Sequence, residues 1–144
     1  MTEGLQILLL VHFFSTVFMT GLCWFVQIVH YPLFKAVRSE DLPQYERKNK
    51  VTGYITVPVM LVELFSGLFL AYHFWELPHI LNLAFLGIIW LSTAVYQVPM
   101  HLKLMQAAHA DTLNKLIQTN WIRTISWSIR SIIICQILWQ LLST

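Results

Sequence analysis

The stretch from Asn120 to Gln140, NWIRTISWSIRSIIICQILWQ, has the length and hydrophobicity of a membrane-spanning helix, yet it contains two arginines. Arg123 and Arg130 are seven residues apart, close to two helical turns, so both side chains leave the same face. An arginine near the middle of a bilayer costs at least about 2.5 to 3.5 kcal/mol and normally faces a bundle interior or a counter-charge. The other apolar runs contain a single carboxylate, Glu63. We therefore predict that Arg130 faces inward and lies at the depth of Glu63.

The composition is that of an integral membrane protein, with 57% hydrophobic and only 11% charged residues. Four apolar runs are long enough to cross a bilayer, at residues 5–29, 52–74, 78–98 and 121–142. None of them alternates with a period of two, which argues against a β-barrel. The sequence predicts an all-α, four-helix integral membrane bundle that forms one transmembrane domain over residues 1–144.

The basic residues predict the orientation. The first run lacks a basic leader and a cleavage site, so we predict a retained span. Basic residues gather between runs one and two and between runs three and four: Lys35, Arg38, Arg47, Lys48, Lys50, Lys103 and Lys115. By the positive-inside rule both long loops are cytoplasmic and both termini face outward, in a cell inner or plasma membrane. The net charge of +2 gives no reason to expect a nucleic-acid partner.

Prolines and capping residues predict where the helices end. The first helix should end before Pro32, and the third should end or kink at Pro99. Residues 32–50 and 100–119 are amphipathic and predict helical extensions on the cytoplasmic side, with Ser39 or Asp41 as candidate N-cap of the first and Asp111 of the second. We expect the charges of residues 32–50 to be solvated.

Runs one and three also end alike, with a glutamine, a histidine and a proline. These are Gln27, His30 and Pro32 in the first run, and Gln97, His101 and Pro99 in the third. The similarity indicates either a decayed parallel duplication of a two-helix hairpin or chance. Cys23 and Cys135 should lie too far apart for a disulfide, and we predict that both are packing residues.

Polar residues inside the predicted bundle form two layers. The inner layer contains Gln27, His30, Gln97, His101 and Arg123, with Glu63 and Arg130 deeper; the outer layer contains His12, His73 and His79. Two arginines against one glutamate leave a surplus positive charge, which an anionic or carbonyl-bearing ligand would complete. The alternative is that Glu63 and Arg130 only lock the bundle while Arg123 reaches the headgroups.

His12 is the candidate metal ligand. It should lie about 10 Å inside the first span, where an unpaired imidazole needs a ligand, a proton or a hydrogen bond. Imidazole suits haem iron, copper or zinc, although the chain matches no metal motif.

The first two runs resemble a known family. The residues that carry the resemblance are His12, Gly21, Trp24, Val26, Tyr31 to Phe34, Ile55 to Met60 and Gly67. They are similar to the bacterial membrane protoporphyrinogen oxidase that carries haem b, which implies a functional histidine at His12. That family has a lysine early in its third span, where this chain has Asn82, Leu83 and Ala84. Val98 to His101 and Asn120-Trp121 are more similar to the small four-helix membrane proteins grouped with anthrone oxygenases, most of which have no known function.

Three functions are consistent with these patterns. The first is a redox protein that binds haem b or another planar or anionic ligand. Its axial ligand is His12, its arginines pair with carboxylates, and Glu63 orients an arginine or relays a proton. The inner-layer residues Gln27, Gln97 and His101 complete the site. The second is a carrier or channel for a small solute, hinged at Pro58 and Pro99. The third is an accessory subunit of a larger membrane complex, and a homodimer is also compatible with four spans.

Overall fold

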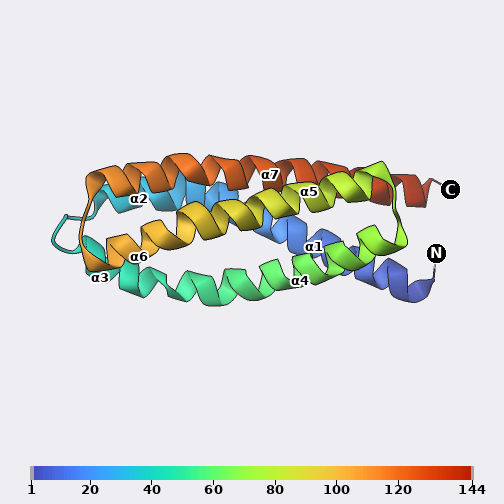
Figure 1. Cartoon of the computed structure of the whole chain (residues 1–144), viewed down its shortest axis with the longest axis horizontal. Helices are drawn as coiled ribbons and strands as arrows, with labels where there is room; N and C mark the ends of the chain where they lie inside the picture. The colour runs from blue at the N-terminus through green and yellow to red at the C-terminus, as the bar shows by residue number, and fades with distance from the viewer. Residues whose placement is uncertain (1, 144) are drawn as a thin grey trace.

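The chain folds as four long helical rods that pack side by side, as the computed structural model of residues 2–143 shows (Figure 1). The rods run from Glu3 to Ala36, Leu42 to His73, Leu77 to Gln106 and Ala110 to Leu142. Each is long and apolar enough to cross a membrane, and no strand occurs in the described part of the chain. The all-α prediction is therefore confirmed.

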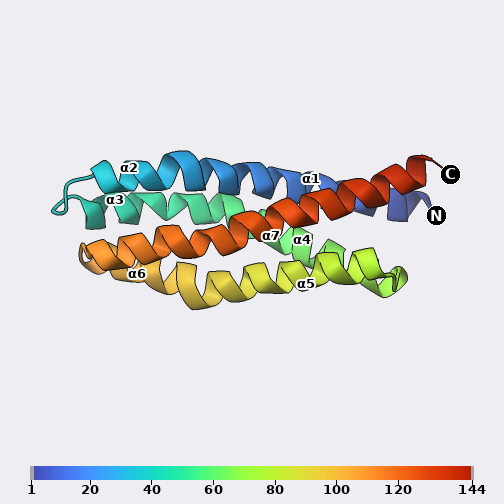
Figure 2. The ribbon, with the colours of Figure 1, turned by 90° about the horizontal axis from the view of Figure 1, so that it is seen from above.

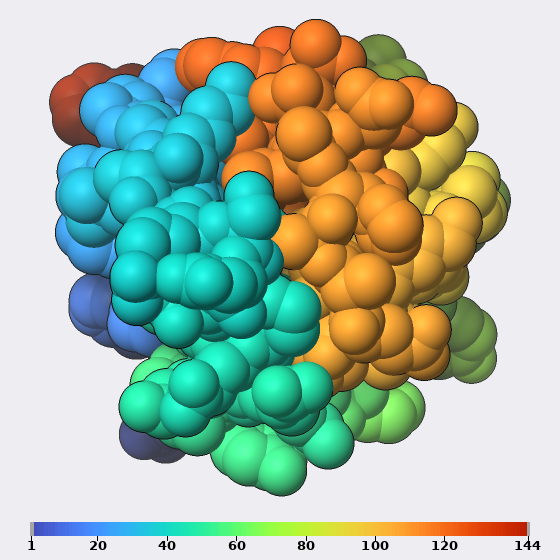
Figure 3. Space-filling view, turned by 90° about the vertical axis from the view of Figure 1, so that its left-hand side faces the viewer, coloured from blue at the N-terminus to red at the C-terminus, as the bar shows by residue number. Residues whose placement is uncertain are grey.

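The rods consist of nine segments. These are α1 (Glu3–Phe25), η1 (Val26–His30), α2 (Tyr31–Ala36), α3 (Leu42–Asn49), α4 (Val51–His73), α5 (Leu77–Ser92), η2 (Thr93–Gln97), α6 (Val98–Gln106) and α7 (Ala110–Leu142). Both termini and the α4–α5 connection lie at one end of the bundle, and the other two connections lie at the opposite end (Figures 1 and 2). At that opposite end, α3 packs beside α6 and the start of α7 (Figure 3).

The prediction that the first helix ends before Pro32 is wrong. The helix widens into one π-turn, η1, in which the Tyr31 N–H bonds to the Val26 carbonyl, and it then continues as α2. The third rod does the same before Pro99, where the Val98 N–H bonds to the Thr93 carbonyl across η2. A wider turn before proline absorbs the missing N–H and the ring clash without breaking the helix.

Two capping predictions have different outcomes. Asp41 precedes α3 as its N-cap residue, although its side chain makes no capping hydrogen bond, and Pro43 lies in the first turn. Asp111 is not an N-cap, because α7 already begins at Ala110 and His109 precedes it. Asp111 instead lies in the first turn of α7, where a carboxylate interacts favourably with the helix dipole.

The two hairpins, α1 to α4 and α5 to α7, are equivalent along the chain. The same offset of 67 positions separates the first π-turn from the second and Pro32 from Pro99. It also separates Glu63 from its partner Arg130. This register aligns His30 with Gln97, rather than the two glutamines that looked alike in sequence. This common offset is the pattern that a parallel duplication of a two-helix hairpin would leave.

Three buried apolar clusters divide the interior from one end to the other. We call the end that holds the α2–α3 and α6–α7 connections the looped end; the cluster there includes Phe34 and Leu116. The middle cluster includes Met19 and Trp127, and the cluster near the termini includes Leu9 and Ile134. Both cysteines are free. Cys23 packs into the middle cluster as predicted, whereas Cys135 is exposed, so the prediction that it is a packing residue is wrong. Buried polar side chains lie between these clusters and form the candidate sites.

Candidate functional site

Arg130 lies at the centre of the bundle and is completely buried. Its NH1 donates to Glu63 Oε1 at 2.7 Å, and Glu63 is equally inaccessible. The predicted inward direction of Arg130 and its match in depth with Glu63 are confirmed. The pair links α4 to α7, and its two charges compensate each other in a region without solvent.

The remaining donors and acceptors around this pair come from all four rods. Arg130 Nε donates to Asn82 Oδ1 at 3.2 Å, and Trp127 Nε1 donates to the Glu63 carboxylate at 3.0 Å. His12 Nε2 lies 3.4 Å from Arg130 NH2. We call this group the central network; its members are His12, Glu63, Ser66, Asn82, Trp127 and Arg130. Every member is at most 4% exposed, so the network is closed to the outside.

The structure corrects the predicted place of His12. It belongs to the central network rather than to an outer layer with His73 and His79, because α1 passes Arg130 at this depth. Gly67 on α4 makes room for the ring: a Cβ there would lie 3.1 Å from His12 Cε1.

The central network leaves His12 no nitrogen with which to bind a metal. The Ser66 hydroxyl donates to the Val62 carbonyl at 2.6 Å, so its oxygen accepts from His12 Nδ1 at 2.7 Å. Nε2 then carries the lone pair and faces the Arg130 guanidinium at 3.4 Å. Asn82 Oδ1, 3.2 Å from Nε2, accepts from Arg130 Nε instead of from the ring. Nowhere in residues 2–143 do three or more His, Cys, Asp or Glu side chains gather as a metal site would require.

Two of the predicted inner-layer residues serve mainly as links to α7. Gln27 accepts from Asn120 Nδ2 at 2.8 Å and donates to the Ile117 carbonyl. Gln97 accepts from the Tyr31 hydroxyl at 3.0 Å and donates to Thr119 Oγ1 at 3.0 Å. These bonds satisfy both amides, and only Gln97 also lines a cavity.

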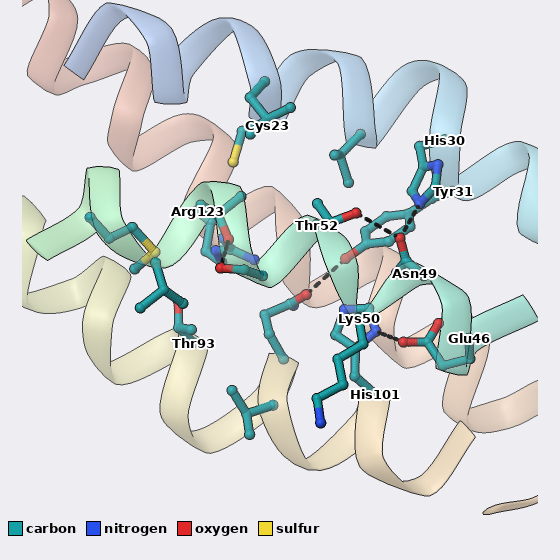
Figure 4. Close-up of a pocket in the computed structure, with 18 of the residues that line it drawn as sticks. Cys23, His30, Tyr31, Glu46, Asn49, Lys50, Thr52, Thr93, His101 and Arg123 are labelled. Carbon is teal, nitrogen blue, oxygen red and sulfur yellow. Dashed lines mark hydrogen bonds and ion pairs between the residues drawn. The ribbon is translucent and has the colours of Figure 1, made fainter. Parts of the chain in front are cut away.

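A cavity of about 280 Å³ lies on the looped-end side of the central network (Figure 4). Side chains from the first, second and third rods and from α7 line it, and both π-turns contribute, through His30 and Gln97. The ionisable side chains around it are Arg123, Lys50, Glu46, His30, His101, Tyr31 and Cys23. Apolar atoms make most of the wall, as in sites for small organic ligands.

Arg123 lies at the deep end of this cavity (Figure 4). Its guanidinium stacks on the Trp127 ring at 5.1 Å, and NH1 makes a long bond of 3.4 Å to Asn120 Oδ1. Nε is buried and has no hydrogen-bond partner. Within the described residues no carboxylate forms an ion pair with Arg123. The surplus positive charge predicted from the sequence therefore belongs to Arg123, since Glu63 neutralises Arg130.

Glu46 lies at the other end of the cavity, and the prediction that it is solvated is wrong. It is 2% exposed because α6 covers the face of α3 that carries it. Its Oε1 is 2.6 Å from His101 Nδ1, while Oε2 is buried without a partner. An amphipathic pattern marks the face of α3 but does not reveal which helix covers it.

Haem b, which the family resemblance implies, does not fit around His12, because both ring nitrogens are engaged and His12 does not line the cavity. The resemblance itself stays a prediction. No family model, no curated protein and no solved structure matches this chain.

Proposed function

We propose that this chain is a membrane-spanning bundle that binds an anionic, mainly apolar ligand in the cavity beside Arg123. The observation that carries the proposal is the guanidinium of Arg123, which has no carboxylate partner and a buried, unpartnered Nε, beside a cavity whose wall is mainly apolar. A carboxylate or similar group would accept the free N–H and supply the missing negative charge.

The outer surface supports membrane insertion. Large apolar side chains point outward along every rod, including Phe14 at 65%, Phe65 at 66%, Leu91 at 65% and Ile132 at 68% exposure. A water-soluble protein rarely exposes apolar surface so continuously, whereas acyl chains would cover it favourably.

The basic connections support an orientation with both termini outside. Lys35, Arg38, Lys103 and Lys115 all lie toward the looped end, which the positive-inside rule assigns to the cytoplasm. In intact cells lacking other reactive thiols, a membrane-impermeant reagent should label Ser143→Cys but not Ser39→Cys. Labelling of Ser39→Cys alone would reverse the orientation.

The cavity wall favours a flexible hydrocarbon on the ligand. Its apolar part includes Met19, Met60 and Met105, and methionine adapts to irregular apolar shapes. A saturated carboxylic acid of medium length combines such a chain with the required anion, and it serves as the probe.

The test is equilibrium binding of dodecanoic acid to the protein in lipid nanodiscs, with empty nanodiscs as the partition baseline. The acid should bind more tightly than its methyl ester, and Arg123→Gln should weaken the acid at least about tenfold, as expected for a lost charge-assisted hydrogen bond. Arg38→Gln is the matched control, because that side chain is 74% exposed and does not line the cavity. Equal binding of acid and ester, or no effect of Arg123→Gln, would refute the proposal.

A further inference from the structure

We infer that Glu46 and His101 form a second polar subsite of the same cavity, which receives a hydrogen-bond donor at the far end of the ligand. The inference rests on the proposed function, and it narrows the ligand class. The ligand would carry an anionic group at one end and a hydroxyl or amine at the other, joined by an apolar chain.

The first support is the unused acceptor on Glu46. The carboxylate is 2% exposed, and only Oε1 has a partner, His101 Nδ1 at 2.6 Å. Oε2 is buried and unpaired, and the residue lines the cavity. A buried carboxylate oxygen without a donor is costly, so a donor on the ligand would relieve that cost.

The second support is the way His101 holds the carboxylate. Tyr31 and His101 pack with ring centroids 6.4 Å apart, and the Tyr31 hydroxyl is itself bound to Gln97. These contacts fix the imidazole and, through it, the direction of Glu46. Figure 4 shows Glu46 and His101 bonded to each other at the opposite end of the cavity from Arg123.

The third support is that the two unpartnered polar atoms at the cavity are complementary. Arg123 Nε is a donor without an acceptor, and Glu46 Oε2 is an acceptor without a donor. In the hairpin repeat Arg123 is equivalent to Thr56, and Glu46 precedes Thr56 by about three helical turns, or roughly 15 Å. That separation suits a medium-length chain with polar groups at both ends.

The test compares four ligands on the unmodified protein in nanodiscs. Dodecanoic acid with a terminal hydroxyl should bind about tenfold more tightly than dodecanoic acid, because it gains a hydrogen bond to a charged acceptor. The terminal methyl ether has no donor and should lose this advantage. A terminal amine in place of the hydroxyl tells whether the subsite prefers a neutral or a cationic donor, since only the preferred group gives the full gain.

Glu46→Gln tests the subsite by changing the protein instead of the ligand. It replaces the carboxylate, which carries the free acceptor, with an amide of the same size. The hydroxyl advantage, measured as the ratio of the affinities of the hydroxylated and the plain acid for the same variant, should disappear. Glu40→Gln, at a side chain 69% exposed in the preceding connection, should leave this ratio unchanged.

The outcomes separate the two proposals. If plain acid binding depends on Arg123 but neither donor improves it in the unmodified protein, the subsite inference is wrong and the proposed function stands. The inference also fails if Glu46→Gln leaves the donor advantage intact. If plain acid does not bind, or binds independently of Arg123, the proposed function fails and the subsite inference falls with it.

Discussion

Arg130 and Arg123 leave the same face of α7 two turns apart, yet their surroundings differ completely. Arg130 is saturated by Glu63, Asn82 and His12 and has no access to any exterior. Arg123 has one long hydrogen bond, an aromatic face and a cavity in front of it. The comparison teaches that a buried charged side chain is a candidate ligand-binding residue only where it lacks a counter-charge from the protein and borders a cavity.

Substitutions in the central network should therefore lower the free energy of unfolding more than substitutions at the cavity do. Arg130→Met leaves the Glu63 carboxylate buried without a counter-charge, and we expect a loss of about 3 to 5 kcal/mol in the free energy of unfolding. Denaturant titration in detergent, followed by helical circular dichroism, measures the loss.

The matched control is the double variant Glu63→Leu with Arg130→Met. It removes both charges and should recover a large part of the stability, since an apolar pair of similar volume often replaces a buried ion pair at little cost. A double variant as unstable as Arg130→Met would show that the stability of the bundle does not depend on this ion pair.

Packing against the network gives the next effect. Gly67→Ala would place a Cβ 3.1 Å from His12 Cε1 and should cost about 1 to 3 kcal/mol through overpacking. Gly87→Ala is the control, because nothing lies within 4 Å of a Cβ there and alanine favours the helix. Melting temperatures that fall for both variants alike would argue against a tightly packed His12.

The smallest stability effect is expected at the cavity. Arg123→Gln loses one cation–π contact, worth about 0.5 to 1 kcal/mol, together with a long hydrogen bond to Asn120. In the same denaturant titration, Arg123→Gln should lose several times less free energy of unfolding than Arg130→Met. A loss as large as that of Arg130→Met would mean that Arg123 also locks the bundle.

Much of the architecture could be predicted from the sequence. Hydropathy identified four helices, and the cost of an isolated charge in an apolar environment was enough to bring Arg130 and Glu63 together. The helix ends were harder to predict, because a proline was assumed to stop a helix that in fact passes through a π-turn.

The site residues were predicted unevenly, for reasons of tertiary structure. Arg123 and His101 were selected because they lie on polar faces at a shared depth, and both line the cavity. Glu46 was missed because its burial depends on α6, which is distant in sequence. His12 was selected as a ligand residue, but its partners Ser66 and Arg130 come from two other rods, so the sequence did not show that both ring nitrogens are engaged.

The most direct test of the contrast between the two arginines is the shift in melting temperature that dodecanoic acid produces. A ligand that binds only the folded state stabilises it by RT ln(1 + L/Kd), where L is the concentration of free ligand, so the melting temperature rises with that concentration. We predict a concentration-dependent rise in the unmodified protein and almost none in Arg123→Gln, whose ligand-free melting temperature stays close to that of the parent. An undiminished rise in Arg123→Gln would contradict the assignment of Arg123 as the receptor of the anion.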